Sequence, residues 1–293
     1  MCQPALSHQT TAVVVFNQPL TKTQFLLRLL APEVARGAEP GHFVHLNCHP
    51  NLTLPRPFSI LDADIALGTV DIFYQVVGEG SGWMSRWQPG EKITLLGPIG
   101  RGFPKPDAGR RALLIAGGIG YAPLDFYARQ LKAQGIETLF LLGMESDDPP
   151  FELTPATTSI ESDPIIQPLA VARQVFLGIP SRLSSLVAKP GFFQGYVTEL
   201  AAEMLQALSL EKRQRTDLFV CGPTPMMKAA AEMAARFQLG GYVSLEEHMA
   251  CGFGGCAGCV APIRAKDGTW HYRRVCTDGP VFPLQDVGWD NTL

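Results

Sequence analysis

Four cysteines near the C-terminal end of this 293-residue chain have a spacing that suits iron–sulfur chemistry. Three lie in the stretch MACGFGGCAGCVAP (residues 249–262) with the pattern C-x4-C-x2-C, and the fourth follows after sixteen residues. This is the spacing of plant-type [2Fe–2S] sites. The glycines between them let the backbone approach a small anionic cluster and direct amides at its sulfur atoms. The predicted ligands are Cys251, Cys256, Cys259 and Cys276.

Two other interpretations of the cysteines remain open, a structural zinc site and four unrelated buried thiols. Zinc favours two short paired spacings, whereas Cys276 has no cysteine near it in the sequence. Cys2 and Cys48 are interpreted as ordinary thiols. A [2Fe–2S] cluster passes one electron at a time, so the chain needs a donor and an acceptor for those electrons.

Two short motifs in the first hundred residues favour a flavin nucleotide. In RPFS (residues 56–59), Arg56 suits a diphosphate and Ser59 suits the polar edge of a flavin ring. In GEGSG (residues 78–82), glycines and free amides precede a short helical stretch and suit phosphate oxygens. Each motif is also compatible with a purely structural strand end or turn.

A later pair of motifs favours a second nucleotide. LLIAGGIGYAPL (residues 113–124) runs from a buried strand through glycines into a helix, which places a pyrophosphate at the helix start. Pro123 stands where the usual fingerprint has its third glycine, so a simple tight turn remains an alternative. VCGPTPMM (residues 220–227) repeats the strand-to-helix arrangement. The candidate residues are Gly117, Gly118, Gly120, Cys221, Gly222 and Pro223.

The elements that must position these motifs fall into two patterns. Short alternating apolar runs with Pro-Gly breaks predict a small antiparallel barrel of six strands, with a helical turn at 81–87 before the last strand. The predicted strands are 11–16, 23–30, 42–48, 56–61, 69–77 and 91–96.

From about residue 106 strands alternate with helices, which predicts a doubly wound parallel sheet. Residues 144–170 are rich in Pro, Ser, Thr and acids and are expected to form a loop-rich surface excursion, with room for one short helix. Thr224 is expected to cap the helix that follows it, with Pro225 at the first position. The predicted strands are 111–116, 137–143, 174–179 and 217–222, and the predicted helices are 123–134, 198–208 and the one after Thr224.

These patterns predict three domains, a flavin-binding barrel (1–105), a nucleotide-binding α/β domain (106–240) and a small cluster domain (241–293) with little regular structure. Apolar residues form 46% of the chain and charged residues 17%, which supports packed cores. The net charge of −3 without a basic run argues against nucleic acid. No apolar run is long enough for a membrane helix and no signal peptide is evident, so we expect a cytoplasmic protein.

No acid–base or nucleophile constellation is visible, so we expect no catalytic residue beyond the cofactor relay. His42, His45 and His49 lie on or near one predicted strand, but His42 and His45 fall on opposite faces of it, which argues against a metal site. All three are interpreted as surface or satisfied polar residues. His248, His271 and the pair Glu246-Glu247 are interpreted as solvent-facing.

Taken in order, RPFS, GEGS, GGIGYAPL and CGPTPMM resemble the ferredoxin–NADP reductase superfamily. The tail SLEEHMACGFGGCAGCVAP…RVCTDGPVF resembles the electron-transfer subunit of class 1B dihydroorotate dehydrogenase. The long 144–170 excursion and the pair Tyr121-Ala122 depart from that pattern. The resemblance implies that residues 117–120 and 221–223 bind NADH and that Cys221 lies near the nicotinamide, although an ordinary buried thiol remains an alternative. It also implies the following FAD contacts: Arg56, Pro57, Phe58, Ser59, Phe73, Tyr74, Gln75, Gly80 and Ser81.

The resemblance further implies that electrons pass between NAD(H), FAD and the [2Fe–2S] cluster and the FMN of a separate catalytic subunit, in a heterotetramer of two copies of each that serves pyrimidine (UMP) biosynthesis. Alternatives are a stand-alone NAD(P)H reductase for an oxygenase or ferredoxin, a diaphorase-like subunit of a hydrogenase or transhydrogenase complex, and a zinc-bearing assembly module. Met249, Phe253 and Val260 are candidates for the partner surface or for the core of the cluster domain.

The turn after the second strand of the α/β domain predicts the choice of nicotinamide. A 2′-phosphate needs a cation there, whereas this turn reads Met144, Glu145, Ser146, Asp147 and Asp148. We therefore expect NADH to be preferred over NADPH.

Overall fold

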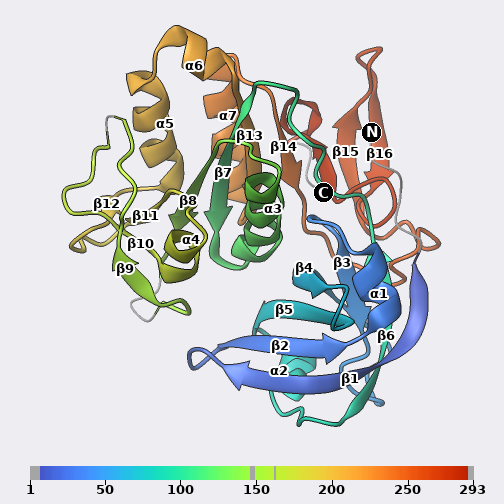
Figure 1. Ribbon diagram of the computed structural model, residues 1–293. Coiled ribbons are helices and arrows are strands. Elements are labelled where there is room, and N and C mark those ends of the chain that lie inside the picture. Colours follow the sequence, from blue (N-terminus) through green and yellow to red (C-terminus); the bar gives the residue numbers. More distant parts are fainter. Residues whose placement is uncertain (1–6, 146–148, 162, 290–293) are drawn as a thin grey trace. The chain divides into compact units, whose positions relative to one another are not determined.

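The computed structural model describes residues 7–145, 149–161 and 163–289, which belong to two compact units (Figure 1). The first unit contains Met1–Pro104, Ser244–Phe282 and Asp286–Leu293. The second contains Lys105–Val243 and Pro283–Gln285. The chain thus changes unit after Pro104 and after Val243, and the domain boundaries at 105 and 240 stay predictions. The cysteine-rich residues share a unit with the N-terminal strands, and a separate third domain stays a prediction.

The first unit is built on a closed barrel, and the prediction of six strands is confirmed. The strand order is β1-β2-β5-β4-β3-β6, and each neighbouring pair in this order is antiparallel, as is the closing pair β6–β1. The strands are β1 (His8–Pro19), β2 (Gln24–Leu30), β3 (Phe43–Leu46), β4 (Arg56–Asp64), β5 (Thr69–Gln75) and β6 (Lys92–Ile99). Two short helices accompany them, α1 (Pro32–Gly37) and α2 (Glu79–Met84).

Alternation of apolar residues directs one face of β2 into the barrel, where Leu27 and Leu29 are fully buried because residues two apart share a strand face. On β5 both faces are covered, since Asp71 and Phe73 are buried together with Val70 and Ile72. The strand β4 differs along its length. Its first four residues are only partly buried, whereas Ile60 and Leu61 are in the core. The RPFS motif therefore occupies the accessible end of a core strand.

The cysteine-rich tail has more regular structure than its sequence pattern indicated. It forms the antiparallel pair β15 (Val260–Arg264) and β16 (Trp270–Arg274). Backbone hydrogen bonds tie the tail to the end of the barrel, since the Arg101 amide donates to the Gly279 carbonyl at 2.7 Å. The Arg101 side chain also donates to the Thr277 carbonyl, at 3.3 Å. The cysteine loop is thus held directly on the barrel unit.

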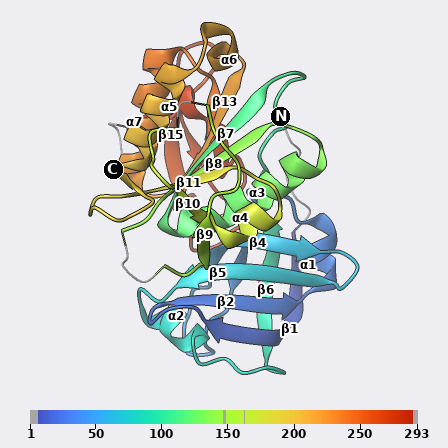
Figure 2. The same ribbon diagram turned by 60° about the vertical axis from the view of Figure 1, so that its left-hand side comes forward.

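The second unit is the predicted parallel sheet covered by helices on both faces. Its strands follow the order β12-β11-β8-β7-β13-β14, and the pairs β7–β8, β8–β11, β11–β12 and β7–β13 are parallel. Helix α3 covers one face, and α5 and α7 cover the other (Figure 1 and Figure 2). The elements are β7 (Arg111–Gly117), η1 (Gly118–Gly120), α3 (Tyr121–Ala133), β8 (Thr138–Gly143), β11 (Ser181–Ser185), β12 (Phe193–Gln194), α5 (Val197–Ala207), α6 (Leu210–Gln214), β13 (Thr216–Cys221), α7 (Thr224–Phe237) and β14 (Gly241–Ser244). Two further short elements follow the cysteine-rich residues, the strand β17 (Val281–Pro283) and the 3-10 helix η2 (Leu284–Asp286).

Two local expectations for this unit were wrong. The apolar run at 174–179 is not a strand, because it contains the end of helix α4 (Ala172–Phe176) and the turn that follows it. In that run the polar Gln174 is buried while Phe176 is 89% exposed, the reverse of the apolar pattern. Thr224 does not cap the next helix, since the helix begins at Thr224 itself and Pro223 occupies the cap position.

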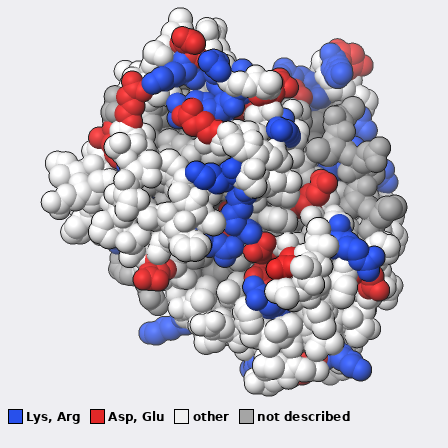
Figure 3. Space-filling view, viewed as in Figure 1, with Lys and Arg blue, Asp and Glu red and all other residues white. Residues whose placement is uncertain are grey.

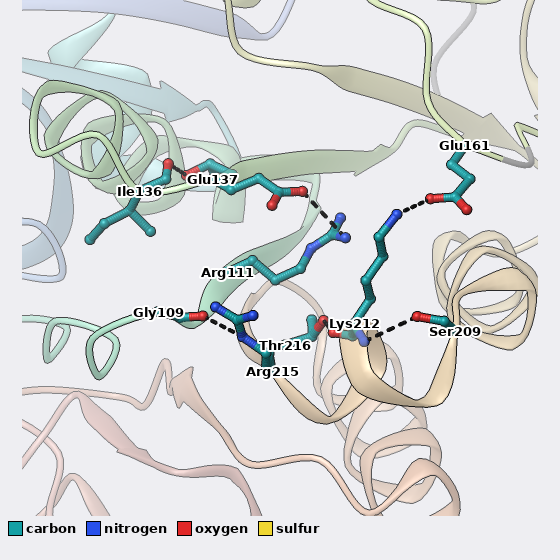
Figure 4. Close-up of polar contacts among 10 residues, drawn as sticks. Gly109, Arg111, Ile136, Glu137, Glu161, Ser209, Lys212, Arg215 and Thr216 are labelled. Atoms are coloured by element: carbon teal, nitrogen blue, oxygen red, sulfur yellow. Dashed lines mark hydrogen bonds and ion pairs between the residues drawn. The ribbon is translucent and has the colours of Figure 1, made fainter.

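The 144–170 excursion is anchored on the second unit, and Ser146–Asp148 and Ser162 lie outside the described residues. Its ordered part forms the two-stranded ribbon β9 (Leu153–Pro155) and β10 (Leu169–Val171). The buried Arg182 of β11 donates to the Thr158 carbonyl at 2.8 Å and pairs with Asp163. Glu161 pairs with Lys212 of α6, beside the Arg111–Glu137 ion pair (Figure 4). The excursion therefore has specific attachment points.

Candidate functional site

The four predicted ligand cysteines gather in the tail, where two pairs interact directly and the Cys276 thiol is also affected by the charge of Cys251. The Cys256 amide donates to the Cys251 sulfur at 3.4 Å, and the side chains of Cys251 and Cys256 also interact. The buried Cys276 interacts with the buried Cys259, next to a 2.8 Å hydrogen bond from the Val275 amide to the Cys259 carbonyl. One pair lies nearer the surface and the other lies within the unit. Two sulfur pairs suit two iron ions.

Backbone amides of the loop surround the Cys251 sulfur. Burial opposes ionisation of this thiol, but hydrogen bonds from the amides of Cys256, Phe253 and Gly255 outweigh it and lower its pKa to about 7. Burial and the neighbouring Cys259 raise the pKa of Cys276 to about 12. Amide donors directed at thiolate sulfur are the surroundings that iron–sulfur clusters require. The residues present therefore fit such a cluster.

A site for a single metal ion is not supported in the described part of the chain. Within residues 7–145, 149–161 and 163–289, no three His, Cys, Asp or Glu side chains converge as ligands of one ion. Tetrahedral zinc would require four ligands around one centre. The amide donors on the Cys251 sulfur and the glycine-rich loop favour an iron–sulfur cluster over zinc.

The loop passes directly over the barrel at Gly252. Gly252 has φ +74°, and a Cβ atom there would lie 2.7 Å from Nδ1 and 2.9 Å from Cε1 of His45. Real Cβ atoms do not approach so closely, so only glycine fits against this imidazole. The contact joins the cysteine loop to strand β3, which pairs with the RPFS strand β4.

The expectation that His45 is a surface or satisfied polar residue was wrong. Its side chain is 1% exposed, and among the described residues neither ring nitrogen has a hydrogen-bond partner. His42 is also buried, but its Nδ1 accepts from the Glu39 amide at 3.0 Å. Burial lowers the pKa of each imidazole to about 4, so both rings are neutral near neutral pH. His49 instead stacks on Trp83, with ring centroids 4.0 Å apart.

The barrel brings part of the predicted flavin set together. A Cβ on Gly80 would lie 3.2 Å from Cγ of Arg56, so the start of α2 adjoins the Arg56 side chain. The Arg56 guanidinium donates to the Leu54 carbonyl at 2.7 Å. The Ser81 hydroxyl accepts from the Val77 amide at 3.0 Å and so orders the turn before α2. The Arg56 side chain thus lies next to the first turn of α2.

The aromatic members of that set do not share one orientation. Phe58 and Tyr74 meet edge to face, with ring centroids 5.9 Å apart, while the Tyr74 hydroxyl donates to Asn17 at 3.1 Å. Phe73 and Gln75 alternate with Tyr74 along β5, so they fall on the other strand face. Pro57 lies opposite His45 and Ser59 opposite Phe43, which places these four residues on one face of the β3–β4 pair.

The predicted nicotinamide set converges where β7 and β13 end. A Cβ on Gly120 would lie 2.2 Å from the Cys221 carbonyl oxygen, and one on Gly222 would lie 3.0 Å from the Gly117 nitrogen. A Cβ on Gly117 would lie 3.0 Å from Pro223. The two strand ends therefore touch through their backbones, which only glycine permits.

Within this junction Gly118 and Cys221 have opposite surroundings. Gly118 is exposed, has φ +53°, and a Cβ there would meet nothing within 4 Å. It is the point at which the loop is open to a ligand. The Cys221 side chain is fully buried. The interpretation of Cys221 as a core thiol therefore remains alongside a role near the nicotinamide.

The turn predicted to set the choice of nicotinamide is only partly described. Met144 is buried and Glu145 is exposed at the end of β8. Ser146, Asp147 and Asp148 lie outside the described residues.

Sequence reasoning missed a buried polar network that begins at Tyr121. The Tyr121 hydroxyl donates to Asp125 at 2.8 Å, and the Tyr121 ring packs on Phe151 with centroids 4.0 Å apart. Asp125 is fully buried and also contacts Gln174, Arg129 and Arg173. The spacing Tyr121, Asp125, Arg129 is i, i+4 along a helix and was the visible signal. The network joins α3 to α4 and to the excursion.

No helix among the described residues is long and apolar enough to cross a membrane. On the face drawn in Figure 3, both basic and acidic side chains are visible. The charge distribution on that face agrees with the low net charge of −3.

Solved structures show the class of fold that this chain adopts. The structure described as NADH-dependent reduced ferredoxin-NADP oxidoreductase, solved for flavin-based electron bifurcation, superposes with a TM-score of 0.78 at 24% identity, over 95% of this chain and 90% of that one. The ferredoxin reductase of carbazole 1,9a-dioxygenase superposes with a TM-score of 0.60 at 19% identity, over 80% of this chain and 67% of that one. The fold is that of ferredoxin reductases.

Sequence relatives define the family. The protein from Desulforamulus reducens named dihydroorotate dehydrogenase B (NAD(+)), electron transfer subunit, is 34% identical over 89% of this chain and 90% of its own length. The protein of the same name from Geobacillus thermodenitrificans is 33% identical over 94% and 96%. The family model of the iron–sulfur cluster binding domain of dihydroorotate dehydrogenase B matches residues 246–288. The chain belongs to the family of dihydroorotate dehydrogenase B electron transfer subunits.

This membership confirms the family resemblance, the fold class and the electron-transfer role expected from the sequence. It also confirms an iron–sulfur cluster in the tail and a catalytic subunit as the partner. The individual binding residues stay predictions.

Proposed function

We propose that this chain carries electrons between NAD(H) and the FMN of a dihydroorotate dehydrogenase catalytic subunit, through FAD on the barrel and a [2Fe–2S] cluster in the tail. The observation that carries the proposal is the seating of the paired cysteine loop on the barrel face that includes Ser59. FAD held on the barrel would supply two-electron exchange with nicotinamide and one-electron exchange with the cluster.

Cys251 and Cys256 would hold one iron, and Cys259 and Cys276 the other. The pairing in the structure supports this division. The loop amides stabilise the anionic sulfur shell. The exposed Cys256 and half-buried Cys251 keep one side of the site near the protein surface, whereas Cys259 and Cys276 hold the inner side.

On the barrel, Arg56 and the first turn of α2 would bind the FAD diphosphate. A guanidinium beside free helix amides suits phosphate oxygens, and Gly80 leaves the required space next to Arg56. Ser59 would hydrogen-bond the flavin ring edge, and the partly exposed Pro57 and Phe58 would line the ring. Tyr74 supports Phe58 from inside the barrel, while Phe73, Gln75 and Ser81 hold the strand and turn in place.

In the second unit, the junction of Gly117, Gly118, Gly120, Gly222 and Pro223 would bind the NADH pyrophosphate. The exposed Gly118 amide region begins a turn that leads into α3, so a phosphate there meets the positive end of the helix. Cys221 supports the junction through its carbonyl contact with Gly120. The acid Glu145 after β8 favours NADH over NADPH.

A surface beside the cluster loop would bind the catalytic subunit. Three aromatic side chains of the tail are exposed and available for it, Phe253 of the cysteine loop and Trp270 and Tyr272 of β16, at 67%, 49% and 59%. Aromatic residues are enriched in protein interfaces. Phe253 of the predicted patch is thus available, whereas Met249 and Val260 are half-buried. We infer a heterotetramer of two electron-transfer and two catalytic subunits, acting in the cytoplasm in pyrimidine biosynthesis.

The proposal is tested by co-purifying the chain with an FMN-binding dihydroorotate dehydrogenase subunit and assaying the complex. The isolated chain should oxidise NADH with ferricyanide but should not turn over dihydroorotate, and adding the partner should produce NAD-linked dihydroorotate oxidation. The Cys256→Ser variant should lose the coupled activity and keep the ferricyanide reaction.

Two results would contradict the proposal. Conversion of dihydroorotate to orotate by the isolated chain would place the chemistry on this subunit. Failure of any FMN-bearing partner to bind, with retained reduction of a ferredoxin, would favour a stand-alone reductase.

A further inference from the structure

The imidazole of His45 is a buried polar group without a described partner, and it lies against the cysteine loop. Its side chain is 1% exposed, and neither Nδ1 nor Nε2 has a hydrogen-bond partner among the described residues. An unsatisfied buried polar group is destabilising, so a native protein retains one where a ligand or cofactor satisfies it. The His45 ring can therefore interact with a bound group or an ordered water, and its position decides which.

The position of the ring restricts what that partner can be. Gly252, the residue after Cys251, crosses the imidazole so closely that a Cβ there would lie 2.7 Å from Nδ1. On the other side, His45 shares a strand-pair face with Pro57 and Ser59. The ring is thus placed between the cysteine loop and the strand end that carries RPFS, within the same unit.

The other buried histidine of this segment shows that burial alone does not explain the feature. His42 is 2% exposed and its Nε2 also lacks a partner among the described residues, but its Nδ1 accepts from the Glu39 amide. It also lies one residue before the start of β3, and the three atoms nearest to a Cβ on Gly252 all belong to His45. His42 therefore has an internal structural partner, whereas His45 faces the loop that holds the metal ligands.

We propose that His45 is a positioning residue whose imidazole N–H donates a hydrogen bond to the sulfur shell of the cluster held by the 251–259 loop. This inference rests on the proposed function, because it requires the cluster at these cysteines. A neutral imidazole provides one N–H donor. A hydrogen bond to sulfur stabilises the added negative charge of the reduced cluster and so raises its reduction potential.

The direct test is a pulsed EPR measurement on the reduced full-length protein, with and without histidine labelled with ¹⁵N. A ¹⁵N hyperfine coupling at the cluster should appear in the wild type and in His42→Gln. It should vanish in His45→Gln, whose amide nitrogen is not labelled. The measurement on the wild type does not depend on the stability of any variant.

A redox titration provides the second readout, which a purely structural role would not move. His45→Leu should lower the equilibrium constant for electron transfer from reduced flavin to the cluster about tenfold, equivalent to a potential about 59 mV more negative for one electron. His45→Gln retains an N–H donor and should restore most of the shift. His42→Leu should leave the potential unchanged.

The outcomes separate this inference from the function on which it rests. A normal cluster EPR signal without ¹⁵N coupling in the wild type would overturn the role of His45 and leave the electron-transfer function intact. An unchanged potential in a cluster-loaded His45→Leu variant would overturn it equally. Complete absence of a cluster signal in the wild type would overturn both proposals.

Discussion

Replacing Gly252 by alanine tests how the cysteine loop is seated on the barrel. The residue has φ +74°, a conformation that costs an L-residue about 1–2 kcal/mol relative to glycine. Its new Cβ would also lie 2.7 Å from Nδ1, 2.9 Å from Cε1 and 3.2 Å from Cγ of His45. The clash is with a ring in a buried strand, which has little freedom to move.

The expected loss of stability combines these two effects. Backbone strain contributes about 1–2 kcal/mol, and overpacking against a buried side chain contributes about 1–3 kcal/mol. Gly268 provides a matched control because it has φ +85° in the same tail, but nothing lies within 4 Å of the position that a Cβ atom would take there. Gly268→Ala should therefore show the strain alone.

Urea unfolding of the cluster-loaded protein, followed by the visible absorbance of the cluster, measures the difference. Gly252→Ala should be less stable than Gly268→Ala by about 1–3 kcal/mol. Adding His45→Ala to Gly252→Ala removes the ring that causes the clash and should recover part of this difference. Equal losses in the two glycine variants would show that the loop does not rest on His45, and the seating argument would then be wrong.

Four further predictions concern other parts of the chain. Arg56→Ala should weaken FAD binding about ten- to a hundredfold in a fluorescence titration, since a charge-assisted hydrogen bond contributes about 1.5–3 kcal/mol; unchanged affinity would remove Arg56 from the flavin site. Burial lowers the pKa of His42 in the folded protein to about 4, below the ordinary value of 6.5. As pH falls from 6.5 towards 4, the imidazole is therefore protonated in the unfolded chain but not in the folded one, and the unfolding free energy decreases. Between pH 7.5 and 5.5 the wild type should lose about 1 kcal/mol of unfolding free energy that His42→Gln does not lose, and equal slopes would contradict this. Asp125→Asn should destabilise the second unit by about 1–3 kcal/mol in urea unfolding because the buried carboxylate accepts from Tyr121 and Gln174 and a neutral amide weakens these hydrogen bonds, whereas a loss below about 0.5 kcal/mol would show that the network is dispensable. NADH should have the higher kcat/KM, Glu145→Arg should raise the value for NADPH, and a wild-type preference for NADPH would indicate a cation elsewhere.

The barrel and the parallel sheet could be predicted because their signals are local. Leu27 and Leu29 are both buried, and their two-residue spacing is visible in the sequence without knowing which strands lie beside them. The glycines between a strand and the next helix likewise mark their turns directly. The four cysteines were equally visible because ligand spacing is a property of the sequence itself. These features require no knowledge of which distant segments meet.

The features that sequence reasoning missed depend on contacts between distant segments. His45 looked like an ordinary strand histidine, because nothing in its neighbourhood along the chain shows that Gly252 crosses it. The run at 174–179 looked like a strand, but Gln174 is drawn inward by the buried Asp125 carboxylate. Hydrophobic periodicity and secondary-structure propensity contain no information about such polar partners. Tertiary contacts can therefore override the structure that they predict.

The grouping of the tail with the barrel was also not visible in the sequence. Composition separates residues 241–293 from the barrel, yet Ser244–Phe282 shares its compact unit. The connection is made by backbone hydrogen bonds, such as that from Arg101 to Gly279. Backbone groups have the same chemistry in every residue, so such a connection leaves no compositional signal.

The central claim is that electrons from NADH reach a cluster held by the paired cysteines, and a single EPR measurement tests it most directly. The full-length protein with FAD bound is reduced anaerobically by NADH, frozen, and compared with Cys276→Ser treated identically. The wild type should give the signal of a reduced [2Fe–2S] cluster, and the variant should lose that signal while its flavin absorbance still bleaches. A wild-type protein whose flavin bleaches without any cluster signal, or a variant that keeps the signal unchanged, would contradict the account.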